Sequence, residues 1–365
     1  MTDAQQKQPK HVMMMAAGTG GHVFPALAVA KDLEQQGIKV SWLATPAGME
    51  NRLLKNHNIP IYQIDIQGVR GNGVVRKLVA PFKILKATLS AMKYMKQLKV
   101  DAVAGFGGYV AGPGGLAARM LGIPVIIHEQ NAVAGFTNTQ LSRIAKKVCQ
   151  AFPNTFPAQD KIVTTGNPVR KEITEIFNPS WRYQEREKAG QPLRILIVGG
   201  SLGAQALNEC VPEALKQLNV PLNVYHQCGQ NHADATRARY ADAPATLNIE
   251  VQPFIEDMAQ AYSDADLIIC RAGALTVTEI ATAGVAAIFV PLPSAVDDHQ
   301  TANARFLANL GAAKICPQAT MTPDSLKALL EPMLNRQLLM EMAVKARQQA
   351  QPDATQHVVR LIQEL

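Results

Sequence analysis

The sequence predicts an α/β protein with two Rossmann-like, doubly wound domains. Three observations indicate this fold class. Short apolar runs rich in strand-forming residues alternate with helix-like stretches along the chain, as in proteins with parallel sheets. A strand, a glycine loop and an amphipathic helix open each half, at residues 13–37 and 195–218. The length of 365 residues exceeds one ordinary core and suits two domains.

Ten apolar runs are expected to form strands, five in each half. In the first half they are residues 11–17, 39–44, 61–66, 101–106 and 124–129. In the second half they are residues 194–200, 222–227, 247–252, 266–271 and 286–291. Ligands of open parallel sheets bind outside the carboxyl ends of the strands. The two domains are therefore expected to face a shared cleft.

A proline-containing stretch separates the two halves. Residues 151–169 hold three prolines and show no helical periodicity, which is typical of a domain boundary. We expect an N-terminal domain of residues 1–167 and a C-terminal domain of residues 168–345. A C-terminal helix at 346–365 could pack back on the N-terminal domain.

Charge is distributed unevenly between the halves. Residues 1–168 hold 19 Lys and Arg against 8 Asp and Glu, whereas the remainder holds 17 against 21. Between Ile66 and Val100 there are eight Lys and Arg and no acid. Such a block indicates either a solvated helix face or an anionic partner: a nucleic acid, a phosphorylated substrate or a lipid surface.

Both glycine loops favour anion binding. Glycines let the chain turn tightly, and the following helix presents unpaired N–H groups and the positive end of its dipole. Neither loop has the dinucleotide pattern, since Val23 stands at the third glycine position of the first loop and the second has the wrong spacing. There is no Walker lysine either, so NAD binding and ATP hydrolysis are disfavoured.

No metal or other cofactor is expected. Asp264 and Asp266 resemble the Asp-x-Asp pair that binds cations in some sugar-nucleotide enzymes, but they precede their strand. Because ligands bind at the opposite end of the sheet, we interpret this pair as a surface turn. Asp297 and Asp298 are interpreted as loop acids. Five scattered cysteines without a CxxC pair exclude a local zinc site and indicate a reducing compartment.

Polar residues gather where the predicted strands end. Glu279 follows a glycine loop and lies in the first turns of the next helix. Its carboxylate can accept hydrogen bonds from two sugar hydroxyls, or it can complement the helix dipole. The loop at 291–304 is rich in hydrogen-bonding groups, and residues 128–131 come just after a buried strand.

Eight segments together resemble the bacterial MurG family. In order along the chain they are GTGGHVFPALAVA, GFGGYVAGPGG, IPVIIHEQN, GNPVR, VGGSLGAQALN, FIEDM, RAGALTVTEI and DDHQTANA. The resemblance implies a glycosyltransferase-B arrangement that transfers N-acetylglucosamine, with inversion and without a metal. The implied donor is UDP-N-acetylglucosamine, and the implied acceptor is undecaprenyl-pyrophosphoryl-N-acetylmuramoyl-pentapeptide of peptidoglycan synthesis. A peripheral position on the cytoplasmic face of the inner membrane is implied, and cell-wall synthesis proteins stay open as partners.

The resemblance also implies which residues contact the donor. They are Thr19, Gly20, Gly21, Asn131, Arg170, Ser201, Ile255, Ala274, Leu275, Thr276, Val277, Thr278, Glu279 and Gln300. Three residues depart from the family pattern. Leu202 stands where relatives often have Gln, Ala272 where some have Ser, and Ser294 in a loop where relatives often carry His.

A single displacement is expected, in which the acceptor's 4-hydroxyl attacks the anomeric carbon while UDP departs. A helix N-terminus with Ser201 and Arg170 can neutralise the departing diphosphate. Glu279 should hold the ribose, and Gln300 should orient the sugar.

The attacking hydroxyl needs a general base that titrates near neutrality. His22, in the first glycine loop, is the candidate, and Glu129 is the alternative. His22 could instead be a structural hydrogen-bond donor that closes the loop. Asn131 cannot take a proton and is expected to position sugar hydroxyls.

Apolar residues recur at helical spacing within the basic block. They predict an interfacial patch that docks reversibly on an anionic membrane surface. The patch comprises Val75, Arg76, Lys77, Val79, Phe82 and Lys83. Leu85 and Leu89 are expected to belong to the core, and Pro81 is expected to begin the helix.

Three other functions are considered. Diacylglycerol glycosyltransferases share the first glycine loop and an interfacial patch, whereas a UDP-N-acetylglucosamine epimerase needs neither a lipid acceptor nor a patch. A nucleic-acid-binding module would stack bases on aromatic side chains, and the basic block offers only Phe82 and Tyr94. No nucleic-acid partner is therefore expected.

Overall fold

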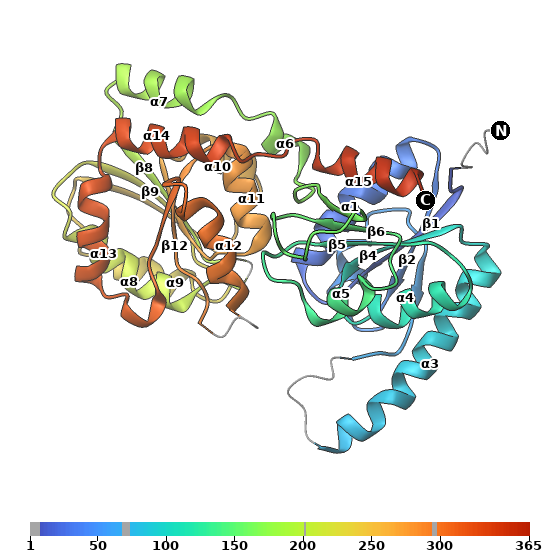
Figure 1. The fold of residues 1–365 in the computed structure, drawn as a ribbon. Coiled ribbons are helices and arrows are strands. Elements are labelled where there is room, and N and C mark those ends of the chain that lie inside the picture. The colour runs from blue at the N-terminus through green and yellow to red at the C-terminus, as the bar shows by residue number, and fades with distance from the viewer. Residues whose placement is uncertain (1–7, 68–73, 201, 294–297) are drawn as a thin grey trace. The chain divides into compact units, whose positions relative to one another are not determined.

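The chain forms two compact units in the computed structural model, which describes residues 8–67, 74–200, 202–293 and 298–365, with side chains from 79 onward in the second range (Figure 1). Unit 1 comprises Met1–Val169 and Gln351–Leu365, and unit 2 comprises Arg170–Ala350. The chain thus passes from unit 1 to unit 2 just after the proline-containing stretch, and it returns to unit 1 before its last helix.

Unit 1 is built on a parallel sheet of seven strands in the order β3-β2-β1-β4-β5-β6-β7. The strands are β1 His11–Ala16, β2 Lys39–Ala44, β3 Ile61–Gln63, β4 Ala102–Gly107, β5 Val125–Glu129, β6 Lys147–Gln150 and β7 Ile162–Thr164. The helices are α1 Gly20–Gln35, α2 Met49–Leu53, α3 Val74–Leu98, α4 Ala111–Met120, α5 Phe136–Leu141 and α15 Ala354–Gln363. The five expected strands are confirmed. Two further strands, β6 and β7, were not expected; they are short and lie next to or within the proline-containing stretch.

Unit 2 is built on a parallel sheet of six strands in the order β10-β9-β8-β11-β12-β13, the dinucleotide-fold arrangement. The strands are β8 Leu193–Val198, β9 Leu222–Gln227, β10 Leu247–Gln252, β11 Leu267–Cys270, β12 Ala286–Phe289 and β13 Ala313–Ile315. The α-helices are α6 Lys171–Thr174, α7 Pro179–Lys188, α8 Gln205–Lys216, α9 Ala233–Arg239, α10 Met258–Asp264, α11 Ala274–Ala283, α12 His299–Ala308, α13 Pro323–Leu330 and α14 Arg336–Arg347. Short 3-10 turns form η2 Gln318–Thr320 and η3 Glu331–Met333. The predicted fold class, two parallel α/β domains, is confirmed.

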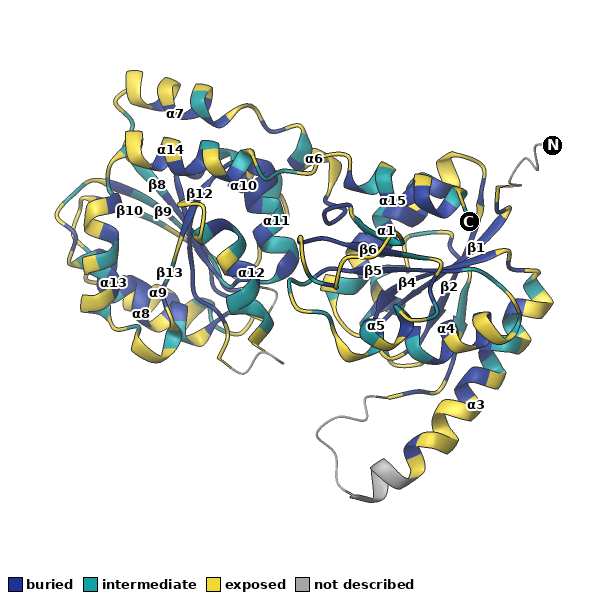
Figure 2. Ribbon diagram, in the orientation of Figure 1, coloured by how far each residue is buried: buried dark blue, intermediate teal, exposed yellow. Residues whose placement is uncertain are grey.

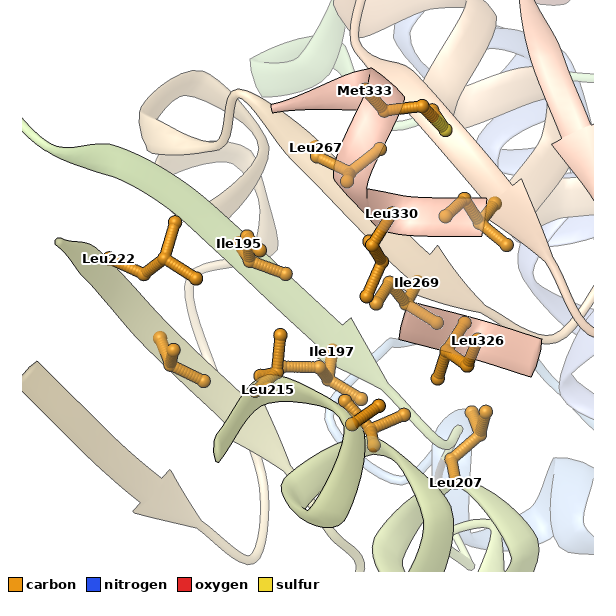
Figure 3. Close-up of a cluster of buried hydrophobic side chains, with 14 of the residues drawn as sticks. Ile195, Ile197, Leu207, Leu215, Leu222, Leu267, Ile269, Leu326, Leu330 and Met333 are labelled. Carbon is orange, nitrogen blue, oxygen red and sulfur yellow. The ribbon is translucent and has the colours of Figure 1, made fainter. Parts of the chain in front are cut away.

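Each unit buries its own apolar core between sheet and helices (Figure 2). In unit 2, Ile195 and Ile197 of β8 and Ile269 of β11 lie against side chains from α8 and α13, as Figure 3 shows. In unit 1, α15 packs on α1, and its Val358 and Ile362 are buried in the cluster that covers one face of the sheet. The last helix therefore completes the core of the first unit.

Helix α3 differs from the prediction at three residues. Pro81 lies inside the helix rather than at its start. Because Pro81 is exposed, water can bond to the backbone carbonyl that loses its helical partner there. Leu85 and Leu89 are 56% and 55% exposed, so their assignment to the core was wrong. Small side chains such as Ala87 and Ala91 form the buried face instead, because they allow close packing against α4.

The predicted surface turn before β11 is half wrong. The side chain of Asp264 is exposed, but Asp266 is fully buried. Its Oδ1 lies 2.9 Å from Nε of Arg186, and its Oδ2 accepts a hydrogen bond from the backbone N–H of Arg194 at 2.9 Å. Asp266 therefore ties α7 to the edge of the sheet where β8 and β11 begin.

Candidate functional site

Unit 2 contains a cavity of about 710 Å³ beyond the carboxyl ends of its central strands. It is lined by the glycine loop after β8, the first turn of α8, the loop after β11, and residues near α12. The lining residues are Gly199, Gly200, Leu202, Gly203, Ala204, Gln205, Ala206, Glu209, Arg271, Gly273, Thr276, Leu292, Gln300 and Gln318. This is the end of an open parallel sheet where ligands bind.

The loop after β8 can be formed only with glycine at two positions. A Cβ on Gly199 would lie 2.5 Å from the backbone N of Ala204, and Gly203 has φ +77° with its Cβ position 2.0 Å from the carbonyl oxygen of Cys228. The loop leads into α8 at Gln205, whose first N–H groups have no partner within the helix. The cavity wall therefore presents N–H groups and a positive dipole end to an anion. Ser201 lies outside the described residues.

Gln300 joins two loops of the cavity. Its Oε1 accepts hydrogen bonds from the backbone N–H of Ala272 at 3.3 Å and of Leu292 at 2.9 Å. Its amide oxygen is thus occupied, and the NH₂ group remains to orient a ligand. Arg271 contributes a cation to the wall, where it donates to the carbonyl oxygens of Val290 and Pro291. No role was expected for Arg271 from the sequence.

Glu279 lies on α11 beside the only arginine that was predicted to contact the donor. Its Oε1 is 3.0 Å from Nη2 of Arg170, and its Oε2 accepts from the hydroxyl of Tyr262 at 3.0 Å. Burial raises the pKa of the Glu279 carboxyl, while Arg170 and Tyr262 act to lower it. No acid occupies the first turn of α11, so the helix-dipole interpretation was wrong. Tyr262 was missed, since no local pattern links it to α11.

The other predicted donor residues of unit 2 differ in accessibility. Thr276 lines the cavity, whereas Ile255, Ala274 and Val277 are buried and Leu275 is half-buried. The Thr278 hydroxyl bonds to carbonyls of its own helix. The side chains of Ile255, Ala274 and Val277 therefore pack in the interior of unit 2. Of the three departures from the family pattern, Leu202 is 85% exposed on the cavity wall, Ala272 is buried, and Ser294 lies outside the described residues.

In unit 1, the first glycine loop is held by a carboxylate. Glu50, fully buried, accepts hydrogen bonds from the backbone N–H of Gly18 at 3.2 Å and from the N–H and hydroxyl of Thr45, both at 2.8 Å. Thr19 is the N-cap of α1, which begins at Gly20, and Gly21 follows in its first turn. Glu50 was not expected here, because it lies 32 residues from Gly18 in the chain.

His22 belongs to the first turn of α1, not to the loop as expected. Its Nδ1 lies 2.9 Å from Oε1 of Gln130, and its side chain is half-buried. A Cβ on Gly107 would come within 2.8 Å of that Nδ1, so the imidazole lies directly against the end of β4. His22 thus has a fixed place in unit 1.

Glu129, the alternative base, is buried and fully engaged. Its Oε1 accepts from the backbone N–H and the side-chain NH₂ of Asn131, and its Oε2 accepts from Gly135 N–H at 3.1 Å and the Asn138 NH₂ at 2.8 Å. Four donors on one carboxylate hold the loop after β5 in place. Glu129 therefore shapes this loop, and its role as the alternative base stays a prediction.

The predicted patch lies on α3, where Val79, Phe82 and Lys83 are all exposed. Val75, Arg76 and Lys77 lie on the same helix, but their side chains are outside those described. In the described part of the chain, no three His, Cys, Asp or Glu residues lie together in a way that could hold a metal ion. Within the same residues, no helix combines the length and apolarity that crossing a bilayer requires.

Comparison with known proteins relates both units to one family. The family model for the glycosyltransferase family 28 N-terminal domain matches residues 12–150, and that for the family 28 C-terminal domain matches residues 194–358. A relative from Acinetobacter baylyi is 80% identical over 100% of both chains. It is named UDP-N-acetylglucosamine–N-acetylmuramyl-(pentapeptide) pyrophosphoryl-undecaprenol N-acetylglucosamine transferase. A protein of the same name from Psychrobacter cryohalolentis is 51% identical over 96% of this chain and 98% of its own.

Solved structures show the same relationship. The crystal structure of Acinetobacter baumannii MurG has a TM-score of 0.88 and 77% identity, and the match covers 98% of this chain and 100% of that one. A UDP-GlcNAc 2-epimerase from Neisseria meningitidis has a TM-score of 0.64 at 13% identity, with 96% and 98% covered. That second likeness concerns the fold alone.

Proposed function

The chain belongs to glycosyltransferase family 28, in the MurG group that its motifs predict, and we propose that it transfers N-acetylglucosamine from UDP-N-acetylglucosamine to a lipid-linked acceptor. The acceptor is the 4-hydroxyl of the N-acetylmuramoyl residue in undecaprenyl-pyrophosphoryl-N-acetylmuramoyl-pentapeptide. The observation that carries this proposal is 80% identity over the full length of a relative with that name. The enzyme is therefore a hexosyltransferase of peptidoglycan synthesis.

The cavity of unit 2 suits a nucleoside diphosphate. A departing diphosphate needs positive potential, which preorganised dipoles supply well where water is excluded. The N-terminus of α8 and the guanidinium of Arg271 provide it at the cavity wall. Arg170, which was expected to do so, is paired with Glu279 instead, so its contribution to the diphosphate requires that pair to open.

One assay separates this function from its alternatives. The enzyme is incubated with UDP-N-acetylglucosamine, with and without the lipid-linked muramoyl-pentapeptide, and UDP release is measured. Release only with this acceptor is expected, and it should persist in the presence of a chelator. An epimerase keeps UDP on the sugar, so conversion of the donor to its epimer without acceptor and without net UDP release would favour the epimerase. Release with diacylglycerol would favour the glycolipid enzyme. Loss of activity with the chelator would contradict the metal-free mechanism.

Replacing Glu279 with alanine should chiefly raise the donor Michaelis constant, by about tenfold or more, because a charged hydrogen-bond acceptor for the ribose is lost. Steady-state kinetics with varied UDP-N-acetylglucosamine measures this. Glu172→Ala on neighbouring α6, an exposed acid, is the control and should change nothing. Tyr262→Phe keeps the carboxylate and should have a smaller effect. An unchanged constant in Glu279→Ala would refute the ribose assignment.

The exposed face of α3 is proposed to dock on the cytoplasmic face of the bacterial inner membrane, where the acceptor's lipid tail resides. Five large apolar residues on this helix are exposed: Val79, Phe82, Ile84, Leu85 and Leu89. Lys83 and Lys86 lie among them, both exposed, and Figure 2 shows this part of α3 mostly in the colour of exposed residues, interrupted by buried ones. Apolar side chains among lysines are what an interfacial helix presents to anionic lipid.

Neutralising Lys83 and Lys86 together as glutamine should weaken binding to anionic liposomes about tenfold to thirtyfold, since each cation contributes roughly 1 kcal/mol near such a surface. Cosedimentation at low and high salt measures it. Lys31→Gln with Lys55→Gln, two exposed lysines elsewhere on unit 1, is the charge-matched control. For the apolar part, Phe82→Ser is compared with Phe177→Ser, whose side chains are 74% and 71% exposed. Liposome binding that is unchanged by salt, by the double lysine variant and by Phe82→Ser would rule out this surface as the membrane contact.

A further inference from the structure

A line of four groups connects the buried interior of unit 1 to His22. The carbonyl oxygen of Gly166 is 2.9 Å from Nε2 of His128, and Nδ1 of His128 is 3.1 Å from Nε2 of Gln130. At the other end of the same amide, Oε1 of Gln130 is 2.9 Å from Nδ1 of His22. His22 is the general base predicted from the sequence, and neither Gln130 nor His128 has a role in the reaction so far.

Only one arrangement of protons satisfies this line. A carbonyl oxygen can only accept, so Nε2 of His128 must donate to Gly166. His128 is 1% exposed, and burial lowers its pKa to about 4, so the ring is neutral and its Nδ1 must accept. The Gln130 amide therefore turns its NH₂ toward His128, where it also lies 3.1 Å from the His128 carbonyl oxygen. Its oxygen is left to face His22, whose Nδ1 must then carry a proton.

The line is held rigidly at each member. Gln130 is 1% exposed; its side-chain NH₂ is held by Nδ1 and the carbonyl oxygen of His128, and its backbone carbonyl oxygen accepts from the side chain of Asn167 at 3.1 Å. The ring of His128 stacks on Phe106 at 5.3 Å between centroids. Neither side chain can turn without breaking buried hydrogen bonds and leaving polar groups without partners. The acceptor offered to His22 therefore has a fixed direction.

We propose that Gln130 and His128 are positioning residues that hold His22 with its proton on Nδ1, so that Nε2 keeps its lone pair for the acceptor's 4-hydroxyl proton. In the described part of the chain, Nδ1 is the ring nitrogen of His22 that has a hydrogen-bond partner. This inference rests on the proposed role of His22 as base. A histidine with its proton on Nε2 would present a donor to the hydroxyl and could not accept from it.

With this tautomer, His22 can take up the proton that the acceptor hydroxyl loses during sugar transfer. The hydroxyl oxygen bonds to the anomeric carbon while its proton passes to Nε2 of His22. The bond between the anomeric carbon and the diphosphate oxygen breaks, and UDP leaves with the electron pair. His22 becomes an imidazolium whose Nδ1–H still donates to Gln130. The amide oxygen thus serves both forms of the ring, before and after proton transfer.

The test combines nitrogen NMR of ¹⁵N-histidine-labelled full-length protein with kinetics. In the unsubstituted protein, His22 should carry its proton on Nδ1. In Gln130→Met, which keeps the side-chain length but removes the acceptor, His22 should show a mixture of tautomers. The kcat of Gln130→Met should fall about tenfold or more. Its Michaelis constant for UDP-N-acetylglucosamine should stay within about twofold of that of the unsubstituted protein. Gln140→Met, an exposed glutamine on α5, is the matched control and should resemble the parent in both measurements.

Two results would overturn this role of Gln130 and His128. One is a proton on Nε2 of His22 in the parent protein, which needs no variant and therefore stands even if Gln130→Met does not fold. The other is an unchanged tautomer and unchanged kcat in folded Gln130→Met. Failure of the base assignment itself would look different: Gln130→Met would shift the tautomer while kcat stayed constant. His128→Phe, which keeps the stack on Phe106, should give an intermediate loss because the amide retains one of its two acceptors.

Discussion

Replacing His22 with alanine is expected to lower turnover by about 10²- to 10⁴-fold while UDP affinity changes little. A positioned general base contributes rate enhancement of that order, and its loss affects only the step in which the hydroxyl proton moves. The imidazole lies in unit 1, whereas the cavity that suits the nucleotide lies in unit 2. Saturating kinetics measures kcat, and calorimetry with UDP measures affinity.

A second histidine provides the control for this experiment. His57→Ala removes an imidazole from the same unit, at a half-buried position after α2, and should leave both quantities unchanged. Equal losses of turnover and UDP affinity in His22→Ala would mean that His22 binds ligand or supports structure. Full turnover would show that another group takes the proton.

Replacing Asp266 with alanine is expected to destabilise unit 2 by about 3–5 kcal/mol, the usual result when one partner of a buried ion pair is removed. The carboxylate is fully buried, with Arg186 at 2.9 Å and Arg336 at 3.5 Å. Without it, the buried guanidinium of Arg186 keeps its charge but loses its carboxylate partner, and the backbone N–H of Arg194 loses its acceptor, whereas Arg336 still pairs with Glu187 at 2.8 Å. Because two units need not unfold together, hydrogen exchange of β8 and β11 amides is the suitable measurement.

The neighbouring acid gives a sharp contrast. Asp264 pairs with Arg194 at 3.1 Å, but its side chain is 48% exposed, so Asp264→Ala should cost only about 0–1 kcal/mol. Similar losses in both variants would show that burial of Asp266 does not govern its contribution. Comparison of the two variants thus tests whether Asp266 is a buried structural residue while Asp264 lies at the surface.

The sequence predicted the sheets better than the helix faces. The runs at residues 11–17 and 286–291 are almost continuously apolar, as is typical of buried parallel strands, and both form strands. Helix α3 has apolar residues on two faces. Periodicity shows that faces exist, but only packing against α4 decides that Ala87 is buried and Leu85 is not.

For the site, the sequence predicted the loops but missed the partners that hold them. The glycine loops and Glu279 carry local signals, since glycines before a helix and an acid after a strand stand close together in the chain. Tyr262, Glu50 and Gln130 act on residues 17, 32 and 108 positions away. No spacing rule connects such pairs, because strand order in the sheet brings them together.

The return of α15 to unit 1 has a consequence during synthesis. Domains generally fold as they emerge from the ribosome, the earlier one first. In this protein unit 1 is completed last, because it requires Gln351–Leu365, which are translated after the whole of unit 2. Until Val358 and Ile362 emerge, the part of α1 that packs on α15 stays uncovered. A nascent chain therefore exposes an apolar surface on unit 1 for the whole time that unit 2 is translated. A premature stop before residue 351 leaves unit 1, which is made first, without its last helix.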